Sequence, residues 1–352
     1  MQERGDRLEA LLAERELDRL LVTDLVNVRY LTGFTGTNGA CVCGPGIRLF
    51  LTDFRYTERA AAEVSEWETV TVTGDWLAGI AERLTGKVGF EDDHVSVRSL
   101  HKLNEKLSEG TEAVAAGGAV EALRRVKDAE ELAAIAEASK LADAALKATV
   151  EDGFVGKTER AVADAFEARV RAGGGVPSFD TIVAGGPNGA QPHAEPGPRV
   201  IERGELVVFD MGAKLDGYCS DGTRTYATGD PGEEGRRVYE TVLVAQQAAI
   251  EAIRPGEKGE DVDAAARKVI DDAGHGEHFG HGLGHGVGLD IHEGPRLSLR
   301  SDDVLAANEV VTVEPGIYLA GNLGVRIEDL VVVTDNGLRN LSSLPKDLTH
   351  VD

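Results

Sequence analysis

Four acidic residues in the second half of the chain stand where runs of apolar residues end or break. They are Asp210, Asp221, Glu314 and Glu328. Four carboxylates buried together are strongly unfavourable unless positive charge compensates them. Two divalent cations would supply four charges and leave a neutral imidazole as a fifth ligand. Bridging carboxylates hold such ions about 3.5–4 Å apart, where a shared water ionises near neutral pH and attacks a carbonyl.

This pattern of acids favours a dinuclear metallohydrolase. Each acid alone is also compatible with a turn or an ion pair, and the argument rests on all four occurring in one domain. Four oxygen donors against one nitrogen favour harder ions, so Mn²⁺ is the expected metal, with Co²⁺ or Zn²⁺ as alternatives.

Histidines gather in a second segment. Five of the nine histidines lie within residues 275–292, where they alternate with glycines. His281 and His285 have the spacing of a helical zinc site, but this density of glycine opposes a helix and no glutamate follows His281. The glycines match neither common phosphate-binding motif. An extended glycine-rich segment would instead let one or two of the histidines point into a cavity, and the others would be structural.

The surrounding elements must bring these residues together. Residues 1–122 alternate helical and strand patterns, with a hairpin over 40–53, and indicate an α/β N-terminal domain. Residues 123–352 hold a helix that begins after a capping-box pair, Asp128 and Glu131. Three further helices are expected over 158–172, 232–253 and 260–273, and strands over 181–184, 205–213, 217–227, 309–313 and 325–334. Helices segregated from antiparallel strands predict an α+β C-terminal domain.

Composition excludes several classes of function. The 352 residues include 61 acidic and 37 basic side chains, a formal net charge of −24, which disfavours nucleic-acid and membrane-surface binding. No apolar run reaches the roughly 18–20 residues of a membrane helix. Three cysteines cannot build a disulfide framework, and the first residues show no apolar signal-peptide core, so a cytoplasmic protein is expected.

Several segments resemble a known family in order and spacing. In the second domain they are residues 177–183, 191–194, 208–213, 220–225, 280–288, 314–318 and 326–329; in the first they are 27–36 and 51–56. The second domain resembles the pita-bread metallopeptidases, which include methionine aminopeptidase, Xaa-Pro aminopeptidase, Xaa-Pro dipeptidase (prolidase) and creatinase. The first resembles the creatinase/prolidase N-terminal domain.

The resemblance implies a complete metal-ligand set. The five family ligands fall on Asp210, Asp221, His285, Glu314 and Glu328. Asp221 and Glu328 would bridge the two ions, Asp210 would complete one ion, and His285 with Glu314 would complete the other.

The same resemblance assigns the residues that handle protons and orient the substrate. His193, His281 and His292 match the family's functional histidines, and Arg326 matches an arginine beside the bridging glutamate. Glu314 is the expected proton shuttle, whereas His275 and His278 have no counterpart and are expected either at the surface or just behind the residues that form the site. One departure is Gly222, where the family usually has a larger apolar residue.

These features narrow the expected activity. Methionine aminopeptidases lack the N-terminal domain and creatinases lack the metal ligands, which leaves the proline-directed branch. The resemblance implies hydrolysis of the N-terminal Xaa-Pro bond of dipeptides or short peptides by a metal-bridging hydroxide, in a homodimer. The motifs do not distinguish a dipeptidase from an aminopeptidase, because both activities share the same metal ligands. The alternatives are a catalytically silent binding module and an amidohydrolase of the same fold with a non-proline substrate.

Overall fold

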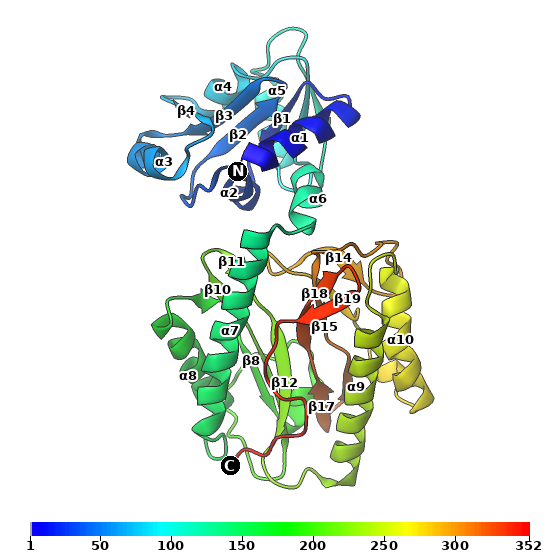
Figure 1. The fold of residues 1–352 in the computed structure, drawn as a ribbon. Helices are drawn as coiled ribbons and strands as arrows, with labels where there is room; N and C mark the ends of the chain where they lie inside the picture. Colours follow the sequence, from blue (N-terminus) through cyan, green and yellow to red (C-terminus); the bar gives the residue numbers. More distant parts are fainter. Residues whose placement is uncertain (1) are drawn as a thin grey trace. The chain divides into compact units, whose positions relative to one another are not determined.

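The computed structural model describes residues 2–352 and divides the chain into two compact units (Figure 1). The first unit ends at Arg124 and the second spans Arg125–Asp352. As predicted, the first is an α/β unit and the second an α+β unit. No helix among the described residues is long and apolar enough to cross a membrane.

The first unit is built on one six-stranded sheet in the order β4-β3-β2-β1-β5-β6. Its strands are β1 (Arg19–Val22), β2 (Ala40–Gly44), β3 (Ile47–Thr52), β4 (Glu68–Thr71), β5 (Lys87–Phe90) and β6 (Glu112–Ala115). The predicted hairpin is β2–β3, and it turns at Gly46 in the left-handed region (φ 69°), which glycine adopts without strain. The strand pairs β3–β4, β1–β5 and β5–β6 are parallel.

Short helices connect these strands. They are α1 (Gln2–Glu14), α2 (Leu25–Thr32), the 3₁₀ turn η1 (Phe54–Tyr56), α3 (Thr57–Glu63), α4 (Trp76–Ala81), α5 (Val97–Asn104) and α6 (Ala119–Arg125). Leucine, isoleucine and valine side chains from the strands and from α4 and α5 form the core of this unit. Cys41 and Cys43 are buried in β2 as free thiols.

In the second unit two pairs of helices lie on opposite sides of the strands (Figure 1). One pair is α7 (Ala129–Glu151) with α8 (Glu159–Ala172), and the other is α9 (Gly232–Ala252) with α10 (Gly259–Asp272). The capping box predicted for α7 is present, because Asp128 and Glu131 each accept a hydrogen bond from the other's backbone N–H. Each helix pair packs against its own apolar core.

The strands of the second unit form four small sheets. Their orders are β11-β10-β7, β12-β9-β8, β14-β13-β15-β18-β19 and β16-β17. The strands are β7 (Val176–Pro177), β8 (Ile182–Gly185), β9 (Leu206–Met211), β10 (Ala213–Leu215), β11 (Tyr218–Cys219), β12 (Gly222–Ala227), β13 (Gly284–Gly286), β14 (Glu293–Leu297), β15 (Val310–Val313), β16 (Gly316–Leu319), β17 (Leu323–Arg326), β18 (Asp329–Thr334) and β19 (Gly337–Asn340). Two 3₁₀ turns, η2 (Gly186–Ala190) and η3 (Gly276–His278), complete the unit.

Three strands that the sequence predicts as continuous are in fact broken, and this corrects the expectation. The predicted strands over 205–213, 217–227 and 325–334 each split into two, because the chain passes from one sheet to another at the break. The backbone N–H of Glu328 donates to Thr223 O instead of continuing the β16–β17 ladder. Asp221 and Glu328 both lie at such breaks, where a side chain is free of the regular alternation of a strand.

Candidate active site

A cavity of about 500 Å³ opens in the second unit. All nine predicted site residues line it: His193, Asp210, Asp221, His281, His285, His292, Glu314, Arg326 and Glu328. Apolar side chains form the remaining wall, among them Phe179, Ile182 and Ile291. The sequence-based selection therefore converges on one place in the fold.

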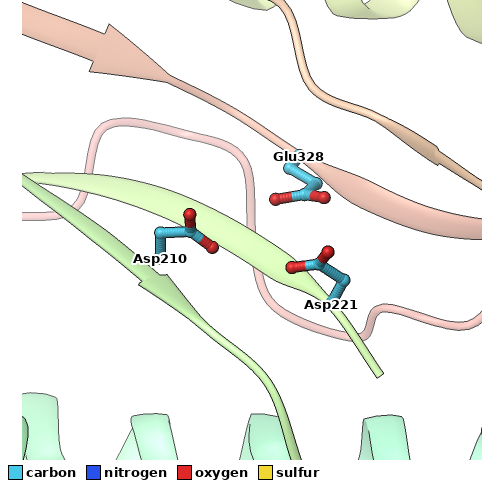
Figure 2. Close-up of side chains that lie close together, drawn as sticks. All are labelled: Asp210, Asp221 and Glu328. Carbon is cyan, nitrogen blue, oxygen red and sulfur yellow. The ribbon is translucent and has the colours of Figure 1, made fainter. Parts of the chain in front are cut away.

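Three carboxylates form the centre of this cavity. Each of Asp210, Asp221 and Glu328 offers an oxygen atom that lies within 4.8 Å of the other two. Figure 2 shows the three groups turned toward one another, with Asp210 on β9, Asp221 just before β12 and Glu328 on the segment opposite. Asp210 is held in β9 opposite Thr223 of β12, and Asp221 directly precedes β12.

The cluster carries negative charge that the chain does not fully compensate. Glu328 is 1% and Asp221 8% exposed. Burial raises the pKa of Asp221, and the nearby Glu328 and Asp210 carboxylates raise it further. Burial, together with Glu314 and Asp210, likewise raises the pKa of Glu328. Asp210 Oδ1 and Glu328 Oε1 are buried and receive no hydrogen bond within the described residues.

His285 adds a nitrogen donor to this cluster. Its Nδ1 lies 3.0 Å from Gly286 O, and since a carbonyl only accepts, Nδ1 carries the proton. Burial lowers the pKa of His285 to about 4, so the ring is neutral. The Nε2 lone pair then lies 3.4 Å from Glu314 Oε1 and 3.6 Å from Asp221 Oδ2, which are also acceptors.

This arrangement fits bound divalent metal ions. A lone pair that faces two carboxylates, with partnerless carboxylate oxygens beside it among the described residues, calls for either protons on these carboxyl groups or cations between the donors. Carboxylate oxygens and a neutral imidazole are ligands that Mn²⁺, Co²⁺ and Zn²⁺ accept. The donor chemistry therefore agrees with the metal centre predicted from the sequence.

Two threonine hydroxyls orient the glutamates of the cluster. Thr223 Oγ1 accepts from Arg326 Nε at 3.1 Å, so its own proton goes to Glu328 Oε2 at 2.7 Å. Thr312 Oγ1 accepts from the backbone N–H of His285 and donates to Glu314 Oε1 at 3.1 Å. Each hydroxyl donates to one oxygen of its glutamate and leaves the other oxygen available to a metal ion.

Arg326 supplies a buried cation at the edge of the cluster. Its guanidinium donates to Asp210 Oδ2 at 2.5 Å and to the Tyr318 hydroxyl at 2.8 Å. Tyr318 lies 2.9 Å from His281 Nε2, while His281 Nδ1 is bonded to Gly282 O. Burial lowers the pKa of His281 to about 4, so Nε2 accepts the tyrosine proton. A continuous hydrogen-bonded chain thus joins Asp210 to His281, and both ring nitrogens of His281 are engaged.

The other histidines divide into two groups. His193 and His292 are exposed on the cavity wall, and the His292 ring lies 4.4 Å from that of His285. His275 and His278 do not line the cavity; their rings lie 5.6 Å apart at η3.

Comparison with known families agrees with this geometry. Residues 133–335 match the model of metallopeptidase family M24, and residues 4–126 match the creatinase/prolidase N-terminal domain. The chain belongs to metallopeptidase family M24. It is accordingly a metallopeptidase and a hydrolase, as predicted.

Relatives of this M24 chain span its whole length. The Xaa-Pro dipeptidase of Pyrococcus furiosus is 38% identical over 352 residues, which cover 99% of this chain and 100% of the relative. The structure of an Xaa-Pro dipeptidase from Bacillus anthracis superposes with a TM-score of 0.97 at 38% identity, covering 99% of each chain. That of an X-Pro aminopeptidase from Thermotoga maritima has a TM-score of 0.91 at 34% identity and covers 99% of this chain and 100% of its own.

Sequence reasoning missed three side chains of the M24 site. Thr223, Thr312 and Tyr318 all lie close in the chain to a predicted ligand. A hydroxyl two residues before a ligand on a strand shares its face, and Thr312 has that spacing to Glu314. Thr223 instead reaches Glu328 across 105 residues, which no local pattern indicates.

Proposed function

We propose that this M24 chain is a dinuclear metal-dependent exopeptidase that hydrolyses the N-terminal Xaa-Pro bond of dipeptides or short peptides. The observation that carries the proposal is the His285 lone pair facing Glu314 and Asp221. The names of the relatives supply the substrate class, since they are called Xaa-Pro dipeptidase and X-Pro aminopeptidase.

In this proposal five side chains hold two ions. Asp221 and Glu328 would contribute to both ions, Asp210 to one of them, and His285 with Glu314 to the other. Mn²⁺ is the preferred metal, with Co²⁺ or Zn²⁺ as alternatives, because four of the five donors are carboxylates. When bound, such a pair supplies a water that ionises near neutral pH and a Lewis acid for the scissile carbonyl.

Groups of the chain itself would handle protons and orient the peptide. Glu314 lines the cavity, where its carboxylate can take up and release a proton during the reaction. His292 and His193 face the cavity from its wall, where they can donate to the tetrahedral intermediate and to the departing proline nitrogen. Arg326 fixes Asp210, and His281 contributes to the wall through its bond to Tyr318.

The cavity supports a small peptide substrate. Its volume of about 500 Å³ lies in the range of small-ligand sites, and Phe179, Ile182 and Ile291 offer an apolar surface to a pyrrolidine ring. The same shape does not separate a dipeptide from a tripeptide, so that choice is left to the experiment.

A substrate panel tests the proposal. Metal-free protein reloaded with Mn²⁺ is given Ala-Pro, Met-Pro, Ala-Pro-Ala and the non-proline dipeptide Ala-Ala. We expect cleavage only where proline is second, and loss of all activity with a chelator. Faster cleavage of Ala-Pro than of Ala-Pro-Ala would define a dipeptidase. Equal cleavage of Ala-Ala would instead indicate an amidohydrolase without proline preference, and no cleavage together with no bound metal would indicate a binding module.

Three further parts of the proposal concern the whole protein. We propose a homodimer, which light scattering can test. We propose a cytoplasmic location, which is supported by the buried thiols of Cys41, Cys43 and Cys219, because none of them forms a disulfide within residues 2–352. The domain limits 1–122 and 123–352 belong to the same proposal, and limited proteolysis followed by mass spectrometry can test them.

A further inference from the structure

Lys127 is a fully buried lysine at the beginning of the second unit. Its side chain is 1% exposed, and its ammonium group lies 3.1 Å from Glu293 Oε2 and 3.2 Å from Arg125 O. The backbone N–H of Lys127 donates to Asn308 O, which ties the segment to the turn before β15. Lysine is rarely buried unless it is paired, so this position needs its carboxylate partner.

Glu293 uses its other oxygen to close a turn. Glu293 Oε1 accepts from the backbone N–H of Asp290 at 3.0 Å, and the turn over residues 290–293 carries His292. The carboxylate packs directly over Gly288, where a Cβ would lie 2.6 Å from Glu293 Oε2. The Glu293 carboxylate therefore lies within the loop formed by residues 288–293. Its charge is compensated by Lys127, which is 166 residues away in the chain.

A separate contact holds the far end of β14. Arg125 donates to the carboxylates of Asp303 and Glu309 and, at 2.8 Å, to Val304 O. Asp303 Oδ2 in turn accepts from the backbone N–H of Arg296 at 2.7 Å. Arg296 lines the cavity as well, so the two basic residues of the segment 125–127 secure the two ends of one cavity wall.

We infer that Lys127 is a positioning residue for His292. Its buried ammonium group fixes Glu293, Glu293 closes the turn, and the turn sets the His292 ring against that of His285. The inference rests on the proposed function in one respect, namely that His292 acts on the substrate. Lys127 does not line the cavity, so an effect of its ammonium group on the reaction must pass through the groups it holds, and Glu293 is the one that closes the turn of His292.

The test combines Lys127→Met with His292→Ala in a double-mutant cycle. Lys127→Met removes the ammonium group that compensates Glu293, and we expect kcat on Ala-Pro to fall about tenfold because a displaced catalytic group costs rate steeply. KM should change little, since Arg125 still holds Arg296. In the His292→Ala background the same substitution should cost almost nothing. Equal costs in the two backgrounds, or an unchanged kcat, would overturn the inference.

Two additional variants separate positioning from loss of stability. Val170→Ala removes buried apolar volume from α8, outside the cavity lining, and should lower Tm without changing kcat. Lys127→Met/Glu293→Gln removes both charges and provides a folded variant if the single substitution unfolds the protein. In this variant the carboxamide oxygen introduced at position 293 can still accept from the backbone N–H of Asp290, so we expect kcat to recover partly. Recovery to the wild-type value would show that the ion pair is dispensable and would overturn the inference.

Hydrogen exchange gives a readout that is independent of activity. In Lys127→Met the Asp290 amide should exchange faster than in the wild type, while amides in α8 keep their protection. Wild-type protein that fails to cleave Xaa-Pro peptides would contradict the proposed function and leave this exchange result intact. Unchanged exchange at residues 288–293 would contradict the positioning role alone.

Discussion

Glu328 and Asp329 are neighbours in the chain, and both are buried, yet the protein treats their charges in opposite ways. Burial alone would raise the pKa of Asp329, but Arg224 and Lys346 lower it overall. Its oxygens accept from four side chains: Arg224, Gln246, Asn340 and Lys346. Glu328 accepts only from Thr223 among side chains, its Oε1 has no partner among the described residues, and burial raises its pKa.

The difference separates two polar networks. In the finished network, around Asp329, the chain itself compensates the buried charge; in the open network, around Glu328, Asp210 and Asp221, it does not. Asp329 is compensated by the chain, and Arg224 also donates to Glu328 O and Thr223 O, so this network fixes the backbone of the adjoining site. Glu328 faces Asp210 and Asp221 instead, where further negative charge lies. Because an uncompensated buried charge is costly, the carboxyl groups around Glu328 must either hold protons, as their raised pKa values indicate, or bind cations.

The largest expected effect comes from breaking the open side. Asp221→Ala should lower kcat/KM by about 1,000-fold or more, since a metal pair supplies several kcal/mol of transition-state stabilisation. Its Tm in chelator should equal or exceed that of the wild type, because the substitution removes mutual repulsion. Steady-state kinetics and thermal melts measure both quantities. Wild-type turnover in purified Asp221→Ala would refute the two-metal assignment.

Breaking the finished side should instead act on folding. Asp329→Asn leaves the buried Arg224 and the half-buried Lys346 without their counter-charge, and we expect about 3–5 kcal/mol of lost unfolding free energy. The matched variant Glu328→Gln, one residue away, should cost little or nothing in chelator. Urea unfolding of both metal-free variants makes the comparison. Equal destabilisation would mean that the two networks do not differ as described.

The uncompensated carboxylates should also make the stability of the metal-free protein depend on pH. The folded protein raises the pKa of Glu314 from 4.5 to about 7, so the folded state holds this proton more tightly than the unfolded state. Stability is therefore lost as the pH rises from about 4.5 to 7, by roughly 3 kcal/mol for this group. Thermal melts with chelator from pH 5 to 8 should show a falling Tm, and added Mn²⁺ should remove the fall. A Tm that rises over this range without metal would contradict the account.

The two networks also differ in how much of each could be predicted from the sequence. The acids of the centre were found from their places at the ends and breaks of apolar runs, and the α7 cap was found from two residues three positions apart. The partners of Asp329 lie 11 to 105 residues away, so nothing local separates its role from that of Glu328. The predicted strand over 325–334 was wrong because its two parts join different sheets: β17 pairs with β16, and β18 pairs with β15 and β19.

A smaller effect is expected where the chain orients the open side. Thr223→Val keeps the shape of the side chain but removes the hydroxyl that fixes Glu328 Oε2, and we expect the Mn²⁺ affinity to fall about 10–100-fold. Thr223→Ser should restore most of it. Thr181→Val is the control, because Thr181 is buried and its hydroxyl has no partner among the described residues. Calorimetric titration of metal-free protein measures the affinities, and equal values for Thr223→Val and Thr181→Val would exclude the orienting role.

The smallest expected effect concerns Gly222, which directly follows Asp221 at the start of β12 and pairs with Met211. Its φ angle is negative or extended, and a Cβ there would meet only Met211 Cε, at 3.5 Å, an ordinary contact. Gly222→Ala should therefore stabilise the protein by about 0.5–1 kcal/mol, because alanine restricts the unfolded chain without straining the folded one. Urea unfolding measures the gain, and Mn²⁺ affinity should stay unchanged. A loss of metal affinity would show that the open side of the centre depends on the backbone at this position as well as on its carboxylates.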